Sequence, residues 1–387
     1  MQSNPHPPAN RPVVGLVGAG QLARMGWQAA ISLDVGLLCL GAAGDAAALA
    51  GAPVMAGSAR DGEALAALAG RSDVLSFEHE LVDLDALARL EAEGVRVRPG
   101  TTTLRLAVDK LHQRRTLAEI ADVRVPPFAP VAALDDVHTF AAQHGWPLVL
   151  KARSGGYDGR GVWMCDDASA ATRALADAAA AELELYAEQA VRLAGEAAVL
   201  VARSPSGEIA VYPPVATHQR DGMCRWVTLP AGLPEALEQQ IDSLARTLAR
   251  ATALEGLMAV ELFLDRDGGL LVNELALRTH NTGHLHTEAA ATSQFEQHLR
   301  AVLDLPLGET APVVAAAAMV NVVGPADGSD PATRLAGALA VPGAHVHLYG
   351  KLARPGRKLG HVTVCGPSPQ AALSLAKQAA DRLEGNG

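Results

Sequence analysis

Two glutamates, Glu261 and Glu274, lie in apolar runs on either side of the dipeptide Asp267-Gly268. Asp-Gly between apolar runs is a strong signal for a two-residue hairpin turn, because both positions accept positive φ. Such a turn would place the two glutamates opposite each other on one face, with Cβ atoms roughly 5 Å apart. Carboxylates that close repel, so a cation between them is favoured, and oxygen ligands indicate Mg²⁺.

A solvated hairpin face is the alternative, and a one-residue slip at Gly268-Gly269 would remove the pairing. The residues after Glu274 argue for a site, because anion-binding and proton-transferring side chains follow at once: Arg278, His280, Asn281 and His284. We expect this stretch to be non-helical. Any one of its histidines taken alone would more often be structural.

A lysine ends the strand predicted over residues 146–151, and four glycines follow within residues 155–161. The backbone amides of such a loop can close over phosphates, and Lys151 would add positive charge. The loop also carries Tyr157, Asp158 and Arg160. A ligand lid is therefore favoured over a long surface hairpin.

The first predicted strand leads into Gly18-Ala19-Gly20-Gln21-Leu22-Ala23, which approximates the dinucleotide-binding fingerprint. A tight turn that feeds a helix N-terminus favours an anion, although a purely structural turn is equally consistent. No acidic residue closes the next strand to hold a ribose, so nicotinamide binding is disfavoured.

Alternating apolar and Ala-rich segments predict a parallel, helix-covered sheet in the N-terminal part of the chain. Its strands are expected at residues 13–17, 35–40, 74–77 and 95–97, and its helices at 21–31, 61–69 and 83–93. An α+β block follows, in which an amphipathic helix at 234–254 is expected to pack against the hairpin. The C-terminal part carries strands at 313–323, 345–349 and 361–364 and a helix at 369–383.

These segments divide the chain into a disordered leader (1–10), a Rossmann-like domain (11–107), a central domain (108–305) with a lid subdomain at about 125–190, and a C-terminal domain (306–387). The C-terminal part includes residues 351–358, with four positive charges. A phosphate clamp and a solvated turn both fit this run.

The composition is that of a globular protein, with 49% hydrophobic and 19% charged residues. The net charge of −10 argues against nucleic-acid and anionic-membrane binding. Cys39, Cys165, Cys224 and Cys365 are scattered singly, without zinc or redox spacing, which favours a reduced, cytoplasmic setting. The apolar run at 313–320 is too short to span a bilayer.

A glycine loop after a strand lysine, followed by two facing carboxylates, resembles the ATP-grasp enzymes. The whole chain from residue 13 onward resembles one family of them, the 5-(carboxyamino)imidazole ribonucleotide synthases, the ATP-dependent partners of phosphoribosylaminoimidazole carboxylase in purine biosynthesis. The motifs that carry this resemblance lie at residues 18–25, 155–161, 273–276, 278–284, 293–300 and 354–361.

The resemblance implies an α/β and α+β architecture: an ATP-grasp fold with an N-terminal Rossmann-like (pre-ATP-grasp) domain and a small C-terminal β-rich domain. It implies that ATP phosphorylates bicarbonate to carboxyphosphate, and that the amine of 5-aminoimidazole ribonucleotide then takes the carboxyl group, leaving ADP and phosphate. It also implies a homodimer whose product passes to a separate mutase.

The resemblance also assigns roles to individual residues. Glu261 and Glu274 match the Mg²⁺ ligands. Nucleotide-binding positions are matched by Lys110, Lys151, Gly156, Gly159, Gly161, Glu188, Gln189, Glu196, Gln219, Asn273 and Glu274. Catalytic positions are matched by Tyr157, Asp158, Arg160, Arg278, His280 and Asn281, and ribonucleotide-binding positions by Gly20, Gln21, Lys351, Arg357 and Lys358.

Some residues depart from the family pattern, notably Val162, Leu277 and the segment from Thr217 to Gln219. The rival interpretations are another ATP-grasp ligase, such as a formate-using glycinamide ribonucleotide transformylase or a biotin-carboxylase-like subunit, and a catalytically silent nucleotide-binding protein. The Tyr157-Asp158 pair and the basic run at 351–358 favour the aminoimidazole substrate.

Overall fold

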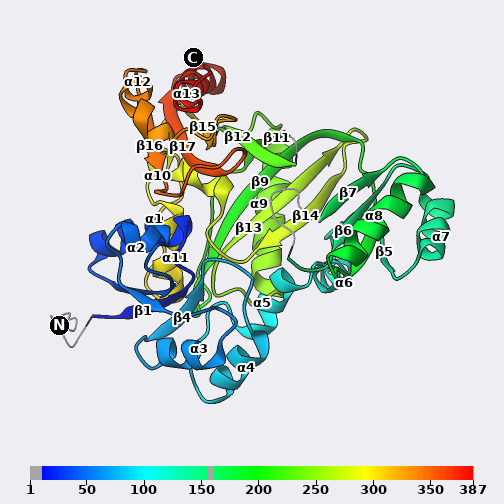
Figure 1. The fold of residues 1–387 in the computed structure, drawn as a ribbon, viewed down its shortest axis with the longest axis horizontal. Helices are drawn as coiled ribbons and strands as arrows, with labels where there is room; N and C mark the ends of the chain where they lie inside the picture. The colour runs from blue at the N-terminus through cyan, green and yellow to red at the C-terminus, as the bar shows by residue number, and fades with distance from the viewer. Residues whose placement is uncertain (1–10, 156–160, 221, 387) are drawn as a thin grey trace.

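The computed structural model describes residues 11–155, 161–220 and 222–386 (Figure 1). The leader expected at 1–10 lies outside the described residues. The chain forms four parts: an N-terminal α/β region, a large central sheet, a smaller α+β region and a C-terminal region. The mixed α/β and α+β architecture agrees with the fold expected from the sequence.

The N-terminal region is a four-stranded sheet in the order β3-β2-β1-β4. All of its strand pairs are parallel, as predicted. The strand expected at 95–97 is only a single bridge between Val97 and Leu75. The elements are β1 (Val13–Val17), α1 (Gln21–Leu33), β2 (Gly36–Gly41), α2 (Ala46–Leu49), β3 (Val54–Ala56), α3 (Gly62–Ala69), β4 (Val74–Phe77), α4 (Leu84–Ala92) and α5 (Thr101–Val108).

The smaller α+β region has its own four-stranded sheet, in the order β5-β8-β6-β7, and its own apolar core. In Figure 1 it lies on the opposite side of the central sheet from the N-terminal region. It is entered from α6 (Lys110–Glu119) and contains β5 (Phe128–Val131), α7 (Leu134–His144), β6 (Leu148–Ala152), β7 (Val162–Cys165), α8 (Ala168–Ala180) and β8 (Leu185–Gln189).

The central sheet has nine strands, in the order β14-β13-β9-β11-β12-β15-β17-β16, with β10 paired to β9. It continues without a break into the C-terminal region, because β12 pairs with β15 from Trp226 opposite Val320 to Leu229 opposite Ala317. Its strands are β9 (Leu193–Arg203), β10 (Ile209–Val211), β11 (Val215–Arg220), β12 (Met223–Leu229), β13 (Gly256–Asp265), β14 (Leu270–Ala276), β15 (Ala316–Val323), β16 (Ala344–Leu348) and β17 (Lys358–Gly366).

Helices cover the central sheet at both ends. The helix α9 (Glu235–Ala251) shares one apolar core with the β13–β14 hairpin, because Ile241 and Leu248 are buried in the same cluster as Val260 and Val272. The strands directly next to α9 are β9 and β10. One hairpin face is therefore buried in the core, and the other face is left for a site. The remaining helices are η1 (Asn281–Leu285), α10 (His286–Ala289), α11 (Gln294–Val302), η2 (Pro331–Arg334), α12 (Leu335–Leu339) and α13 (Pro369–Glu384). Across the described ranges, no helix has the length and apolar character needed to cross a membrane.

Candidate active site

The register of the β13–β14 hairpin places Glu261 opposite Glu274, as predicted. The predicted two-residue turn is wrong, however. Asp265 N donates to Gly269 O and Gly268 N donates to Asp265 O, both at 2.9 Å, so residues 266–268 form a three-residue loop. Gly268 has φ 81°, as the last position of such a loop requires. A β-bulge then places an extra residue, Asn273, in β14, which restores the predicted pairing.

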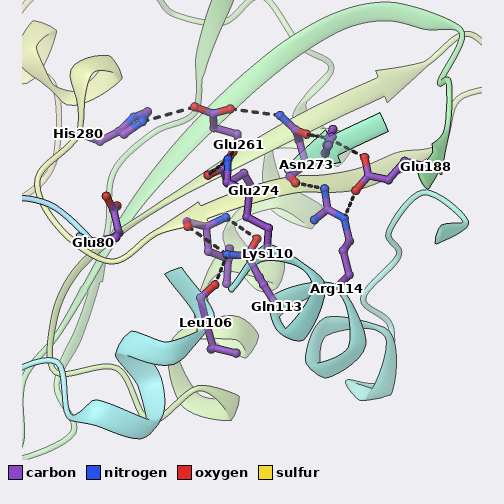
Figure 2. A network of polar contacts seen from close by, with 12 residues as sticks. Glu80, Leu106, Lys110, Gln113, Arg114, Glu188, Glu261, Asn273, Glu274 and His280 are labelled. Atoms are coloured by element: carbon purple, nitrogen blue, oxygen red, sulfur yellow. Dashed lines mark hydrogen bonds and ion pairs between the residues drawn. The ribbon is translucent and has the colours of Figure 1, made fainter. Parts of the chain in front are cut away.

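The bulge also turns the Asn273 side chain toward the site. Asn273 Nδ2 donates to Glu261 Oε2 at 3.2 Å, and Asn273 Oδ1 accepts from Lys151 Nζ at 3.2 Å. A bulge redirects a side chain in this way because two residues of one strand then oppose a single residue of its partner. Figure 2 shows Asn273 beside Glu261 at the centre of the resulting network.

Lys110 balances the charge of Glu274. Its Nζ lies 3.0 Å and 3.1 Å from the two carboxylate oxygens. Lys110 begins α6, and Asp109 caps that helix by accepting from Leu111 N and His112 N. Burial alone lowers the pKa of Lys110, but Glu274, Glu261 and Glu80 outweigh burial and raise it. The cap therefore fixes a charged ammonium group against the carboxylate.

A second group of charges lies deeper, where Arg114 and Lys151 share Glu188. Lys151 Nζ is 2.5 Å from Glu188 Oε2, and Arg114 contacts both Glu188 and the backbone oxygen of Asn273. Burial raises the pKa of Glu188, but the two cations outweigh it and lower the pKa to about 2. The Glu188 side chain is 1% exposed and fully occupied by these partners. The Glu188 side chain therefore pairs with Arg114 and Lys151, and the nucleotide contact expected at Glu188 stays a prediction.

Sequence reasoning missed Arg114, although a signal was present. Lys110 and Arg114 are spaced by four residues, so they share one face of α6. The neighbouring Gln113 was missed as well. Its amide donates to Leu275 O and accepts from Leu275 N, which satisfies the free edge of β14. Figure 2 shows Lys110, Gln113 and Arg114 lying along that edge.

The two facing carboxylates fit a hard cation. Burial, then Glu274 and Glu196, raise the pKa of Glu261 to about 7, whereas Lys110, Lys151 and Arg114 overcome burial and lower the pKa of Glu274. In the part of the chain that the structure describes, no group of three or more His, Cys, Asp or Glu could hold a metal by itself. The pair therefore fits Mg²⁺, which commonly binds through one or two carboxylates and completes its coordination with water and substrate phosphates.

The segment after β14 brings further predicted residues to the pair. His280 Nε2 lies 3.4 Å from Glu261 Oε1, and Arg278 Nε lies 2.8 Å from Glu80 Oε1. The expected non-helical conformation is wrong from Asn281 onward, where η1 begins. His280 caps η1 through Thr282, and its backbone N and O both bond to Gln294 at 2.8 Å. Burial, then Arg278 and Lys358, lower the pKa of His280 to about 3.

The turn at Gly20 holds an anion, but the anion belongs to the protein. Glu78, directly after β4, accepts from Gly20 N at 2.5 Å and Leu22 N at 3.0 Å. A carboxylate suits the positive end of α1, and the absence of a Cβ at Gly20 allows the close approach. The substrate contact expected at Gly20 stays a prediction. Gln21, next to it, contacts Lys351 Nζ and so joins the N-terminal and C-terminal regions.

The other predicted residues are spread around this centre. Glu196 on β9 lies opposite Phe263 of β13, and burial raises its pKa. Arg357 is exposed, and Lys358 begins β17. Gln189 ends β8, Gly161 precedes β7 with φ 74°, and Gln219 is exposed on β11 next to a bulge.

Five predicted site residues lie outside the described residues: Gly156, Tyr157, Asp158, Gly159 and Arg160. Asn281 is half-buried, and its side-chain amide N and O have no hydrogen-bond partner among the residues that the structure describes.

This arrangement defines an ATP-grasp enzyme. The ATP-grasp domain model matches residues 116–295. The model of the ribonucleotide synthetase preATP-grasp domain matches residues 12–108, and that of the phosphoribosylaminoimidazole carboxylase C-terminal domain matches residues 317–374. The three matches follow the order of the N-terminal, central and C-terminal parts described above.

Comparison with similar proteins shows to which family of ATP-grasp enzymes the chain belongs. The N5-carboxyaminoimidazole ribonucleotide synthase of Mycobacterium tuberculosis (strain H37Rv) is 46% identical over 379 residues, which cover 96% of this chain and 88% of that protein. The enzyme of Synechococcus elongatus is 42% identical over 91% of this chain and 89% of its own length. The structure of the Aspergillus clavatus enzyme with ATP has a TM-score of 0.90 and 32% identity, and covers 98% of this chain and 100% of that chain. The chain therefore belongs to the family of N5-carboxyaminoimidazole ribonucleotide synthases.

Proposed function

We propose that this protein is an ADP-forming ligase that carboxylates 5-aminoimidazole ribonucleotide with ATP and bicarbonate in purine biosynthesis. The observation that carries the proposal is the paired Glu261 and Glu274, bordered by Lys110 and Lys151, in a chain of this family. The Aspergillus clavatus relative has been crystallised with ATP, and also with ADP and 5-aminoimidazole ribonucleotide.

The reaction joins groups that repel each other. A bicarbonate oxygen attacks the γ-phosphorus of ATP, and the bond to ADP breaks to leave carboxyphosphate. The amine nitrogen of the ribonucleotide then attacks the carboxyl carbon, phosphate leaves, and the amine loses a proton. Positive groups are needed at each phosphate, because the nucleophile and the electrophile of the first step are both anionic. Lys110 and Lys151, fixed by their carboxylate partners, supply that charge for the triphosphate.

Glu261 and Glu274 would hold Mg²⁺, which supplies further positive charge at the phosphates when bound. Asn273 orients Glu261 through its amide, and the amide is itself held by Lys151. On the other side, the backbone of His280 is fixed by Gln294. The contact of His280 with Glu261 supports assigning Arg278, His280 and Asn281 to the binding of bicarbonate and the acceptor amine.

The ribonucleotide phosphate belongs on the C-terminal side of the site. Lys351 reaches Gln21 at the N-terminus of α1, and the charge of Lys358 influences the buried His280 ring. Arg357 precedes Lys358 on the same exposed turn. These groups would bind a phosphate that lies across the site from the triphosphate. The resemblance assigns Tyr157, Asp158 and Arg160 to catalytic positions, and these residues lie outside the described ranges.

Three finer statements complete the proposal: the protein works in the cytoplasm, forms a homodimer, and passes its product to a separate mutase. The homodimer and the mutase are carried over from the family resemblance, and the cytoplasmic setting from the singly scattered cysteines. Light scattering coupled to size-exclusion chromatography tests the dimer. A mass equal to one chain at micromolar concentration would contradict it.

The activity is tested by incubating the purified protein with ATP, Mg²⁺ and bicarbonate, with and without 5-aminoimidazole ribonucleotide. Release of ADP and phosphate should depend on the ribonucleotide and on bicarbonate. Parallel reactions replace bicarbonate and 5-aminoimidazole ribonucleotide with formate and glycinamide ribonucleotide, or keep bicarbonate and replace the ribonucleotide with biotin. Turnover with either replacement alone would assign a different ATP-grasp activity. ATP binding without turnover on any acceptor would indicate a silent protein.

A further inference from the structure

A stack of three histidines joins the central region to the C-terminal strands. His284 lies in η1, His361 in β17 and His347 in β16, opposite His361. The His284 and His361 rings are 4.5 Å apart with an interplanar angle of 5°, and the His361 and His347 rings are 4.5 Å apart at 17°. Phe295 extends the stack beyond His284, with ring centroids 5.7 Å apart.

Two rings of the stack, His284 and His361, are buried, and His347 is partly exposed. His284 and His361 are fully buried, and burial lowers the pKa of both well below the usual value. Tyr349 Oη lies 2.7 Å from His361 Nδ1, and His347 Nε2 lies 2.6 Å from Glu288 Oε1. Parallel rings cannot aim their nitrogens at one point, so the stack is not a metal centre. Its contribution is aromatic contact between segments that are distant in the chain.

The stack lies between two parts of the proposed site. On one side, η1 is the turn that His280 caps, and His280 contacts Glu261. On the other side, β17 begins at Lys358, and Lys351 lies over the ring of Tyr349, which follows β16, with its Nζ 5.5 Å from the centroid. The same three rings thus connect the carboxylate side of the site with its basic side.

His284 contributes to the stack with its ring rather than with its nitrogens. Neither Nδ1 nor Nε2 of His284 has a hydrogen-bond partner within the described residues. An unpartnered buried polar group costs free energy, so an apolar ring of similar shape should be tolerated or even stabilising. A methyl group should not be tolerated, because it would leave a gap between the rings of Phe295 and His361.

From these contacts we infer that His284, His361 and His347 form a positioning element, which fixes the basic side of the proposed site relative to the paired carboxylates. The inference rests on the proposed function. Correct spacing matters because bicarbonate, bound beside the carboxylates, must be delivered as carboxyphosphate to the amine of a ribonucleotide that is held by its phosphate. An error of about 1 Å in such placement can reduce the rate by about 100-fold.

Variants of His284 test the inference through the two Michaelis constants. His284→Ala should raise the KM for 5-aminoimidazole ribonucleotide at least about tenfold and leave the KM for ATP within about twofold. His284→Phe should restore the ribonucleotide KM to within about threefold of wild type, because it keeps the stacked ring. Thermal unfolding of each variant reports on folding.

His286 provides the matched control. It is two residues away, equally buried and also without partners at either nitrogen within the described residues, but it packs against Tyr212 outside the stack. His286→Ala should lower the melting temperature without changing the ratio of the two KM values. A second test adds His284→Ala to a Lys358→Ala protein, where a further rise in ribonucleotide KM of less than about threefold is expected, because the cation to be positioned is gone.

Equal changes in both KM values for His284→Ala would contradict the inference, as would a folded His284→Phe protein that is as defective as His284→Ala. The latter result would assign a ligand contact to the ring nitrogens. Full additivity with Lys358→Ala would also contradict it. A wild-type protein without ribonucleotide-dependent turnover would overturn the proposed function itself, and this inference with it.

Discussion

At the scale of single residues, the network around the hairpin is a chain of alternating charges. Glu274 faces Lys110, Glu188 faces both Arg114 and Lys151, and Glu261 is linked to Lys151 only through the amide of Asn273. Glu261 is therefore the carboxylate with the least direct compensation. A cation that binds between Glu261 and Glu274 would supply it.

The substitution Glu188→Gln should destabilise the protein by about 3–5 kcal/mol, because it leaves Arg114 and Lys151 as buried cations without their counter-ion. Urea unfolding followed by circular dichroism measures the change. The matched control is Glu184→Gln, which alters an exposed glutamate paired with Arg153 and should cost less than about 1 kcal/mol. Equal losses in the free energy of unfolding for the two variants would show that the buried network stabilises the protein no more than an exposed ion pair does.

Replacing Arg357 with Ala should raise the KM for the ribonucleotide at least about tenfold and that for ATP by less than twofold, because Arg357 belongs to the basic run with Lys351 and Lys358, whereas Lys110 and Lys151 come from α6 and β6. Steady-state kinetics with each substrate varied in turn gives both constants. Arg173→Ala, which alters an exposed arginine on α8, is the control and should change neither. If Arg357→Ala raised both constants equally, the phosphate clamp would have to lie elsewhere.

At the scale of secondary-structure elements, Gly26 of α1 occupies a position where the backbone does not require glycine. Gly26 lies inside the helix, and a Cβ there would meet no atom within 4 Å. Gly26 lines a small apolar cavity together with Phe77 and Leu299. Gly26→Ala should therefore stabilise the protein by about 0.5–1 kcal/mol, measured as a shift in the urea unfolding midpoint.

Gly283→Ala is the opposite case and serves as the control. A Cβ at Gly283 would collide with Gln294 Oε1 and Leu200 Cδ2, so this variant should lose stability. If Gly26→Ala were destabilising as well, the cavity beside α1 would not accommodate a methyl group.

The local elements near the site were largely predictable because their signals are local. Hydrophobic spacing identified α9 and the apolar core that it shares with the hairpin, and an Asp-Gly dipeptide located the turn. The pairing of Glu261 with Glu274 was predicted correctly, but from a turn of the wrong length. Two one-residue irregularities, the longer loop and the bulge at Asn273, cancel each other, and periodicity alone detects neither.

Other parts of the site depend on contacts between distant segments. The Arg114–Glu188 pair joins α6 to β8, and Glu78 reaches the N-terminus of α1 from the end of β4. No pattern within a window of the sequence encodes such pairings. The histidine stack is similar, because the pairing of β16 with β17 and the position of η1 are both needed to bring its rings together.

At the scale of the whole molecule, one continuous sheet connects the two halves of the proposed site. The sequence predicted a separate C-terminal domain, and a family model does match residues 317–374. In the structure this region nevertheless extends the central sheet through β12 and β15. A sheet that is hydrogen-bonded throughout fixes the C-terminal cations relative to the hairpin better than a linker could.

Buried histidines should make the whole protein sensitive to acid. Burial lowers the pKa of His286 and of His298 to about 4. Between pH 6.5 and 4 the unfolded chain binds protons that the folded protein excludes, so stability falls as the pH decreases through this range and levels off below it. Each of these rings should lower the free energy of unfolding at pH 5.5 by on the order of 1 kcal/mol.

This prediction is checked by melting temperatures at pH 7.5 and 5.5. His298→Gln, which keeps a polar group near Ser76 Oγ, should reduce the fall between the two values. His138→Gln alters an exposed ring and should leave the fall unchanged. An identical fall in wild type and His298→Gln would show that buried histidines do not cause it.

The central claim is that Glu261 and Glu274 form the metal-binding pair of a bicarbonate-dependent ligase. The most direct test is ribonucleotide-dependent release of phosphate from ATP by Glu274→Ala, compared with Asp267→Ala, which alters an exposed carboxylate in the turn of the same hairpin. The account predicts that Glu274→Ala loses at least about 100-fold in kcat while it remains folded, and that Asp267→Ala retains normal activity. Near-normal turnover by Glu274→Ala would contradict the account.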